Sequence, residues 1–166
     1  MPLSANRIWR QLPSEVRIAA SKVFLAAPTK EQKQLLCATL AKANNVREVS
    51  VRKAPPERLI NWTAATLSLP DPLANLVLQD YLLHDHLAPI VRYLELLGIP
   101  HSEGVIEENF DLASLPKERI QESARTLLAS AESAGDRPGV ELYLKYLVAQ
   151  GGPWSAIEEV LPAGNA

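Results

Sequence analysis

Apolar residues recur along this chain at the spacing of α-helices. Counting from Val16, the residues at positions i, i+3, i+4, i+7 and i+11 are all valine or alanine. Residues three and four apart share one face of a helix, so this stripe predicts a helix with one buried face. The same spacing predicts further helices over about 30–43, 87–97, 120–134 and 140–150.

Proline and glycine separate these apolar stripes. Proline fits the first turn of a helix, because its missing N–H would have no partner there. Gly98, Gly135 and Gly151 each follow a stripe and are expected to end it. Six prolines stand where a stripe begins: Pro13, Pro56, Pro72, Pro116, Pro138 and Pro153.

The pattern as a whole predicts an all-α fold. We expect a single-domain bundle of about seven or eight short to medium helices over residues 1–166, and short disordered ends are compatible with it. An irregular helical-repeat array is the alternative, because a motif of proline, glutamate and a branched residue occurs three times. The motif has no fixed period, and common helix-start chemistry explains it more simply.

Two segments lack a helical period. Residues 46–53 alternate only partly between polar and apolar. A lone strand would have no pairing partner, so we expect a short helix or an extended linker there. Residues 98–112 form the longest expected loop, which contains several acidic residues. Long loops carry function or mobility more often than short ones.

The composition limits which side chains can fill the core and indicates the cellular compartment. Hydrophobic residues make up 47% of the chain but aromatic residues only 5%, so aliphatic side chains must fill the core. No run approaches the roughly 18 apolar residues of a membrane span, and the first residues lack the apolar region of a signal peptide. The single cysteine, Cys37, excludes an internal disulfide. We therefore expect a soluble, cytoplasmic protein with no membrane partner.

Charge is distributed unevenly along the chain. Residues 1–66 hold 11 Lys and Arg against 4 Asp and Glu, a net charge of +7. Residues 67–166 hold 6 against 15, a net charge of −9. Such asymmetry indicates either an anionic partner for the basic part or mutual attraction of the two parts. That attraction would act within one fold or head-to-tail between copies.

Two of the three histidines lie in the stretch YLLHDHLAP, where His84 and His86 flank Asp85. On one unbroken helix, residues two apart point about 200° from each other and could not share a metal ion. A break is the better interpretation: the helix from Pro72 ends near His84, and Asp85 is the N-cap of the next helix. We expect a helix junction without a metal. The alternative is a metal site on His84, Asp85, His86 and His101.

Other catalytic signatures are absent from the sequence. No GxSxG motif occurs, and Cys37 lies in an apolar helical stretch that disfavours a thiolate. The seven glycines are scattered, so no phosphate-binding loop is predicted. The acidic residues of 98–112 lack the spacing of a calcium loop. We expect no catalytic residue and no cofactor.

These exclusions favour a non-catalytic helical protein-interaction or scaffold domain. Its partner would be another protein or a second copy, bound head-to-tail through the opposite charges. Trp9, Trp62 and Trp154 are each expected in the core, with an interface role as the alternative. A metal-dependent enzyme around His84, His86 and His101 is a further alternative.

Nucleic-acid binding by the basic part is the leading alternative to protein interaction. The pI of about 5.9 is far below the values typical of such proteins. The residues that would contact the nucleic acid are Arg47, Arg52, Lys53 and Arg58.

Overall fold

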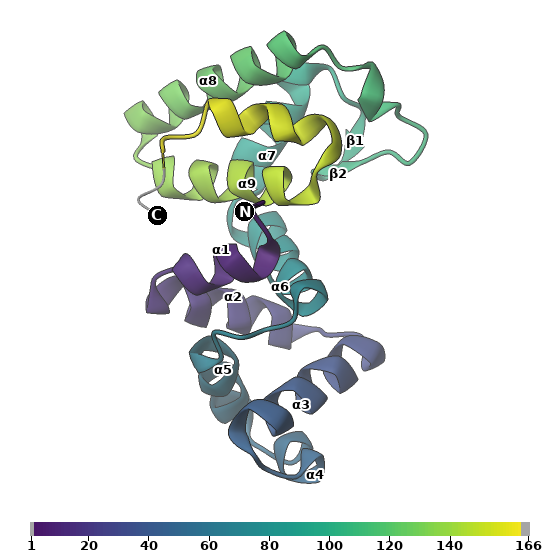
Figure 1. The fold of residues 1–166 in the computed structure, drawn as a ribbon, viewed down its shortest axis with the longest axis vertical. Coiled ribbons are helices and arrows are strands. Elements are labelled where there is room, and N and C mark those ends of the chain that lie inside the picture. The colour runs from purple at the N-terminus through teal and green to yellow at the C-terminus, as the bar shows by residue number, and fades with distance from the viewer. Residues whose placement is uncertain (1, 164–166) are drawn as a thin grey trace. The chain divides into compact units, whose positions relative to one another are not determined.

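The protein is all-α, as the helical spacing predicts (Figure 1). The computed structural model describes residues 2–163, and the expectation of short disordered ends concerns residues outside that range. Within the described part, nine α-helices are joined by turns, one short β-hairpin and two 3-10 helices. The number of α-helices exceeds the expected seven or eight, because two short helices add to the long ones.

The chain divides into two compact units. Residues 4–81 form the first, which we call the N-terminal unit. The residues from 82 onward, with residues 2–3, form the second, the C-terminal unit. Whether residues 1–166 fold cooperatively as one domain stays a prediction, because compactness alone does not measure cooperativity.

The N-terminal unit is built from six helices, the last of which continues beyond Tyr81. The short helix α4 settles the two alternatives for residues 46–53 in favour of a helix. Helix α2 packs against α5, and α3 packs against both α4 and α5. The helices are α1 (Ala5–Gln11), α2 (Ser14–Ala26), α3 (Lys30–Asn44), α4 (Glu48–Arg52), α5 (Pro56–Ala65) and α6 (Asp71–Asp85).

Polar side chains tie the helices of the N-terminal unit to backbone carbonyl groups. Trp9 is fully buried, and its Nε1 donates a hydrogen bond to the carbonyl of Thr66 at 2.9 Å. Arg17 Nε donates to the carbonyl of Ala64 at 2.8 Å. These bonds satisfy carbonyls at the C-terminal end of α5, which have no partner within that helix. The end of α5 is thereby fixed against α1 and α2.

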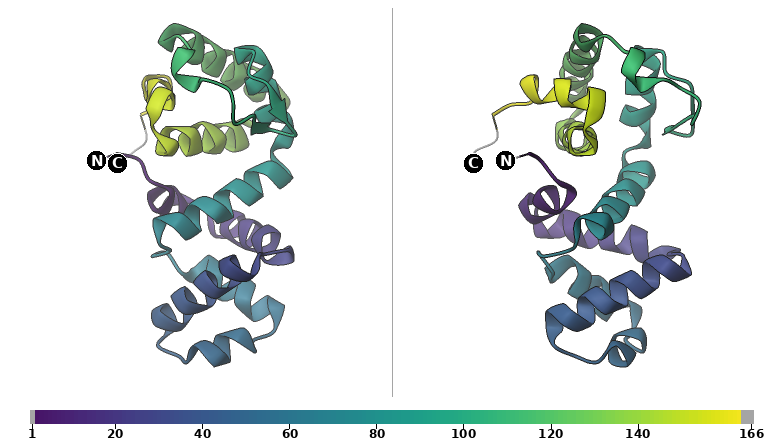
Figure 2. Two further views of the ribbon diagram at one scale, coloured as in Figure 1. Left: turned by 90° about the vertical axis from the view of Figure 1, so that its right-hand side faces the viewer. Right: turned by 45° about the vertical axis from the view of Figure 1, so that its right-hand side comes forward.

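The C-terminal unit contains three long helices and a hairpin. Helix α7 packs against α8 and α9, and η2 lies against α8 and α9, where it is drawn in yellow (Figures 1 and 2). Strands β1 and β2 pair antiparallel, with His101 opposite Ile106. The elements are α7 (Leu87–Leu97), β1 (His101–Ser102), β2 (Val105–Ile106), η1 (Leu112–Ser114), α8 (Lys117–Ala134), α9 (Arg137–Gln150) and η2 (Gly152–Glu159).

Aromatic rings form the centre of the core of the C-terminal unit. The rings of Tyr93 and Tyr143 meet edge to face, with centroids 6.0 Å apart. Trp154, from η2, also contacts Tyr93, with centroids 6.2 Å apart and the rings tilted by 46°. Edge-to-face pairs of this kind are favoured by the quadrupoles of the rings. The cluster therefore holds α7, α9 and η2 together.

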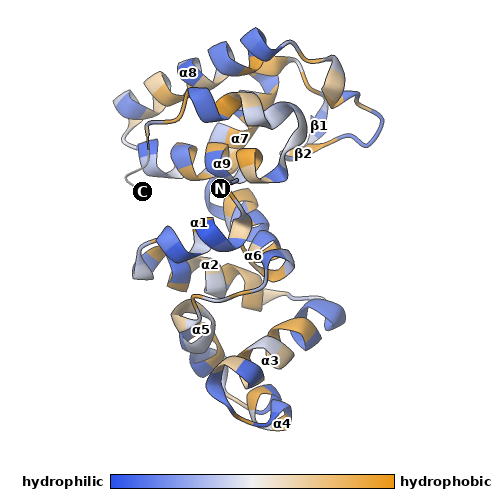
Figure 3. Cartoon of the chain, viewed as in Figure 1, coloured by the Kyte–Doolittle hydropathy of each residue, from blue (hydrophilic) through white to orange (hydrophobic). Residues whose placement is uncertain are grey.

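The predicted helix ends are largely confirmed. Gly98 and Gly135 follow α7 and α8 in the left-handed conformation, with φ of +71° and +75°. Glycine adopts this conformation without the steric cost that a Cβ brings. Figure 3 shows hydrophilic and hydrophobic residues alternating along the helices, as one buried face requires. Among residues 2–163, no helix combines the length and apolar character needed to cross a membrane.

Candidate functional site

The helix junction at the histidines is confirmed, but Asp85 is not its N-cap. Helix α6 runs through Asp85, and His86 occupies the N-cap position of α7. The backbone N–H of His86 still donates to the carbonyl of Leu82 at 2.9 Å, so helical bonding continues past Asp85. The Asp85 carboxylate instead pairs with its neighbour, with 2.5 Å between its Oδ1 and Nδ1 of His84. The expected cap was therefore wrong by one residue.

His86 is held against the start of α9. Its side chain is only 16% exposed, and its Nδ1 lies 3.6 Å from Oδ1 of Asp136. A Cβ added to Gly139 would lie 2.3 Å from the same nitrogen. Real Cβ atoms essentially never come so close to another atom, so this approach of α9 to His86 requires glycine.

His101 lies in the β-hairpin and bonds to its own turn. Its Nδ1 accepts a hydrogen bond from the backbone N–H of Gly104 at 3.2 Å. Gly104 has φ of +83°, and a Cβ there would lie 2.9 Å from Cδ1 of Leu87. The hairpin turn thus packs against the start of α7 without bringing the His101 ring into a shared site.

The structure gives the three histidines separate neighbours. His84 pairs with Asp85, His86 faces Asp136, and His101 bonds to Gly104. Within residues 2–163, no group of three or more His, Cys, Asp or Glu side chains is arranged to hold a metal ion. The candidate set of His84, Asp85, His86 and His101 is therefore not brought together.

Cys37 is a core residue of α3. Its side chain is 1% exposed, and burial raises the pKa of the thiol above its usual value. The nearby cations of Lys33 and Arg52 act in the opposite direction but are weaker than the desolvation. A thiol that resists ionisation is a poor nucleophile.

Exposed cations gather around α4, together with two exposed valines. Arg47 and Lys53 cap the two ends of this helix, and Arg52 pairs with Glu48 at 2.5 Å. The guanidinium of Arg58 lies 4.5 Å from the centre of the Trp62 ring, a cation–π contact. Val49 is 51% exposed. We call this surface the basic patch; it consists of Val46, Arg47, Val49, Arg52, Lys53 and Arg58.

The hairpin and the segment after it form an exposed acidic surface in the C-terminal unit. Val105 is 52% exposed, and acidic side chains surround it in the sequence. Figure 3 shows the loop beside β1 and β2 largely in the hydrophilic colour. No ion pair involving these carboxylates is found among residues 2–163. We call this surface the acidic loop; it consists of Glu103, Val105, Glu107, Glu108 and Asp111.

The charge asymmetry of the sequence coincides with the division into units. Residues 4–81 carry 11 Lys and Arg against 6 Asp and Glu, a net charge of +5, and residues 82–166 carry 6 against 13, a net charge of −7. No protein-family model, curated protein or solved structure matches the chain. The charge and exposure of the side chains in each unit are therefore the features that bear on function.

Proposed function

We propose that the protein is a non-catalytic interaction domain that assembles head-to-tail, the basic patch of one copy binding the acidic loop of the next. The observation that carries this proposal is the presence of two exposed surfaces of opposite charge on two different units. Each surface also includes a valine that is about half exposed, Val49 in one and Val105 in the other. The two surfaces are thus complementary in charge and alike in offering an apolar contact.

Several charged residues on each surface are available for pairing. Arg47 and Lys53 form no ion pair among the described residues, and neither do Glu107 and Glu108. An exposed ion pair contributes only about 0–1 kcal/mol, so several pairs would have to act together. Their larger effects are on the association rate and on the choice of partner. The expected association is weak and falls with added salt.

Such an interface joins two different surfaces rather than one surface with itself. Heterologous contacts of this kind form rings when the rotation between copies closes, and open chains when it does not. Every copy in the assembly keeps one basic and one acidic surface, except at open ends. The assemblies are therefore expected to become shorter as the ionic strength rises and longer as it falls.

Sedimentation velocity of charge-reversed variants tests the proposal. Arg47→Glu/Arg52→Glu/Lys53→Glu turns the basic patch acidic, and Glu107→Lys/Glu108→Lys turns the acidic loop basic. At about 50 mM NaCl, where the Debye length exceeds 10 Å, each variant alone is expected to stay monomeric. An equimolar mixture should assemble again, because the acidic surfaces of the first variant meet the basic surfaces of the second.

The matched control places the same change of charge elsewhere on the N-terminal unit. Arg10, Lys22 and Lys30 are exposed and lie outside the basic patch, so Arg10→Glu/Lys22→Glu/Lys30→Glu should associate like the unaltered chain. A chain that stays monomeric at several hundred micromolar and low salt would contradict the proposal. So would a mixture of the two reversed variants that fails to pair. If the unaltered chain binds DNA without self-associating, and the patch variant loses that DNA binding, the nucleic-acid alternative is favoured.

A further inference from the structure

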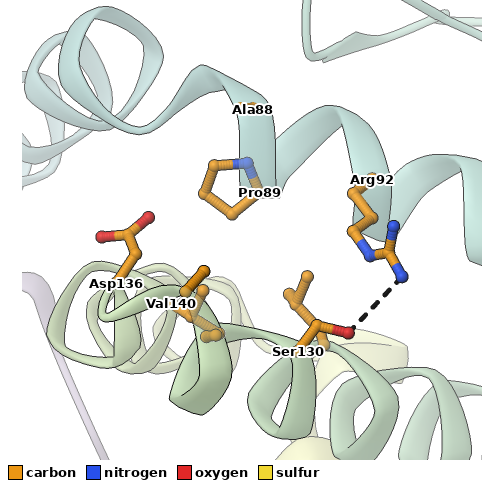
Figure 4. A pocket seen from close by; sticks show the side chains of 9 residues that line it. Ala88, Pro89, Arg92, Ser130, Asp136 and Val140 are labelled. Carbon is orange, nitrogen blue, oxygen red and sulfur yellow. Dashed lines mark hydrogen bonds between the residues drawn. The ribbon is translucent and has the colours of Figure 1, made fainter.

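The C-terminal unit contains a pocket of about 210 Å³ between α7, α8 and α9 (Figure 4). Its walls are mainly apolar and include Pro89, Leu127, Ala131 and Val140. Alanines stand at several positions where these helices face one another, so the helices do not fill the space between them. Apolar pockets with a few polar groups are the usual form of a small-molecule site.

One full positive charge stands at one side of the pocket. Arg92, from α7, reaches toward α8 and donates to Oγ of Ser130 at 3.4 Å. Ser130 in turn donates to the carbonyl of Thr126 at 3.0 Å, so its hydroxyl group is oriented by α8. In the described part of the chain, no carboxylate lies within ion-pair distance of the Arg92 guanidinium. Arg92 therefore has hydrogen-bond donors to offer a ligand.

Among the described residues, one acidic group lines the pocket; it stands on the side opposite Arg92 and has a neighbour of its own. Figure 4 shows Asp136 away from Arg92, with Pro89 and Val140 between them. Oδ1 of Asp136 lies 3.6 Å from Nδ1 of His86. The two charged groups therefore cannot neutralise each other across the pocket.

We propose that this pocket binds a small monocarboxylate with an apolar body, its carboxylate paired with Arg92. An apolar cavity of about 150 Å³ is known to accept benzene, so about 210 Å³ suits a phenyl ring with a short arm. The planar guanidinium group matches a carboxylate through two parallel N–H···O bonds. The ligand carboxylate would also supply the counter-charge that the Arg92 guanidinium lacks among the described residues. The occupant is thus a molecule of the phenylacetate type.

An NMR titration of the full chain with phenylacetate tests this proposal. Amide resonances of residues in α7, α8 and α9 that line the pocket are expected to shift, with saturation in the millimolar range or below. Phenylacetamide has nearly the same shape without the charge, and it should bind at least tenfold more weakly. No shift at 10 mM phenylacetate, or equal binding of the amide, would overturn the proposal.

Two variants locate the binding. Arg92→Met keeps a long side chain without its charge and should weaken phenylacetate binding at least tenfold. Ala134→Leu narrows the pocket at an exposed alanine and should abolish binding while leaving the helices folded. Arg125→Met is the control, because Arg125 is exposed on α8 and does not line the pocket.

The opposite ligand charge provides a second way to overturn the proposal. Benzylamine would pair with Asp136 if the acidic side of the pocket were the recognising one. Tighter binding of benzylamine than of phenylacetate, with Arg92→Met unaffected, would assign the pocket to cations. The titration is independent of self-association, because it can be run on the monomeric charge-reversed variants.

Discussion

The two units tie their helices together through different side-chain contacts. In the N-terminal unit, Trp9 and Arg17 reach from one helix to backbone carbonyls of another. In the C-terminal unit, Tyr93, Tyr143 and Trp154 pack ring against ring. A hydrogen bond fixes a direction, whereas packed rings mainly bury area. Helices of similar composition can therefore be held together in two ways within one chain.

Removal of one buried tryptophan from each unit gives the largest expected effect. Trp9→Ala and Trp154→Ala should each reduce the free energy of unfolding by about 3–5 kcal/mol, as large aromatic truncations in cores do. Trp9→Ala also leaves the carbonyl of Thr66 without its donor. Urea unfolding followed by circular dichroism measures both losses.

Thiol labelling of Cys37 shows whether the two units unfold separately. Cys37 is the only cysteine of the chain and lies buried in the N-terminal unit. If the units open independently, Trp9→Ala accelerates labelling and Trp154→Ala leaves the rate nearly unchanged. Equal acceleration by both variants would show one cooperative domain over both units.

A second, smaller effect is expected where α9 meets His86. Gly139→Ala should lower the melting temperature, with a loss of about 1–3 kcal/mol, because the new Cβ overlaps the imidazole ring. With His86→Ala present, the same substitution should cost much less, because only the flexible Asp136 carboxylate, 2.7 Å from the new Cβ, then has to move. A double-mutant cycle measures the coupling. Additive effects of the two substitutions would contradict the contact.

The smallest expected effect concerns an exposed ion pair of the C-terminal unit. Hydrogen bonds from Lys117 Nζ at 2.6 Å and from Gln121 Nε2 at 2.8 Å lower the pKa of the Glu159 carboxyl below 4.5. The folded pKa is thus below the unfolded one, so the stabilisation is present above about pH 4.5 and is lost as the pH falls through the folded pKa.

The variant Lys117→Met tests this dependence. Its urea midpoint should fall slightly at pH 7 and converge with that of the unaltered chain at the acid end. Glu159→Gln added to Lys117→Met should change little further. A constant difference between Lys117→Met and the unaltered chain at every pH would contradict the assignment.

Local patterns predicted most of the fold. The all-α class is confirmed because apolar spacing and helix ends are properties of neighbouring residues, as at Gly98 and Gly135. The helix break near His84 was also predictable, because the stripe changes phase there. The residue that caps α7 was not, since Asp85 is the favoured N-cap by residue type, whereas helical backbone bonding continues through it to His86.

Contacts between residues far apart in the chain could not be predicted from the sequence. Gly139 follows Pro138 in a sequence typical of a helix start. Glycine is required there because the His86 ring, more than 50 residues earlier in the chain, lies where a Cβ would be. Arg92 lies on an exposed helix face, and only the meeting of α7 with α8 places it at a pocket. The basic and acidic surfaces were predictable as charge, but the exposure of Val49 and Val105 was not.

The close approach of Gly139 to His86 has an evolutionary consequence. Any change of Gly139 to a larger residue forces a shift of the imidazole or of α9, while a smaller residue at position 86 removes the two shortest contacts and leaves the one to Oδ1 of Asp136. Substitutions at the two positions should therefore be accepted together or in one order only, with position 86 shrinking first. Among descendants of this chain, positions 86 and 139 are expected to vary as a pair although they are far apart in the sequence.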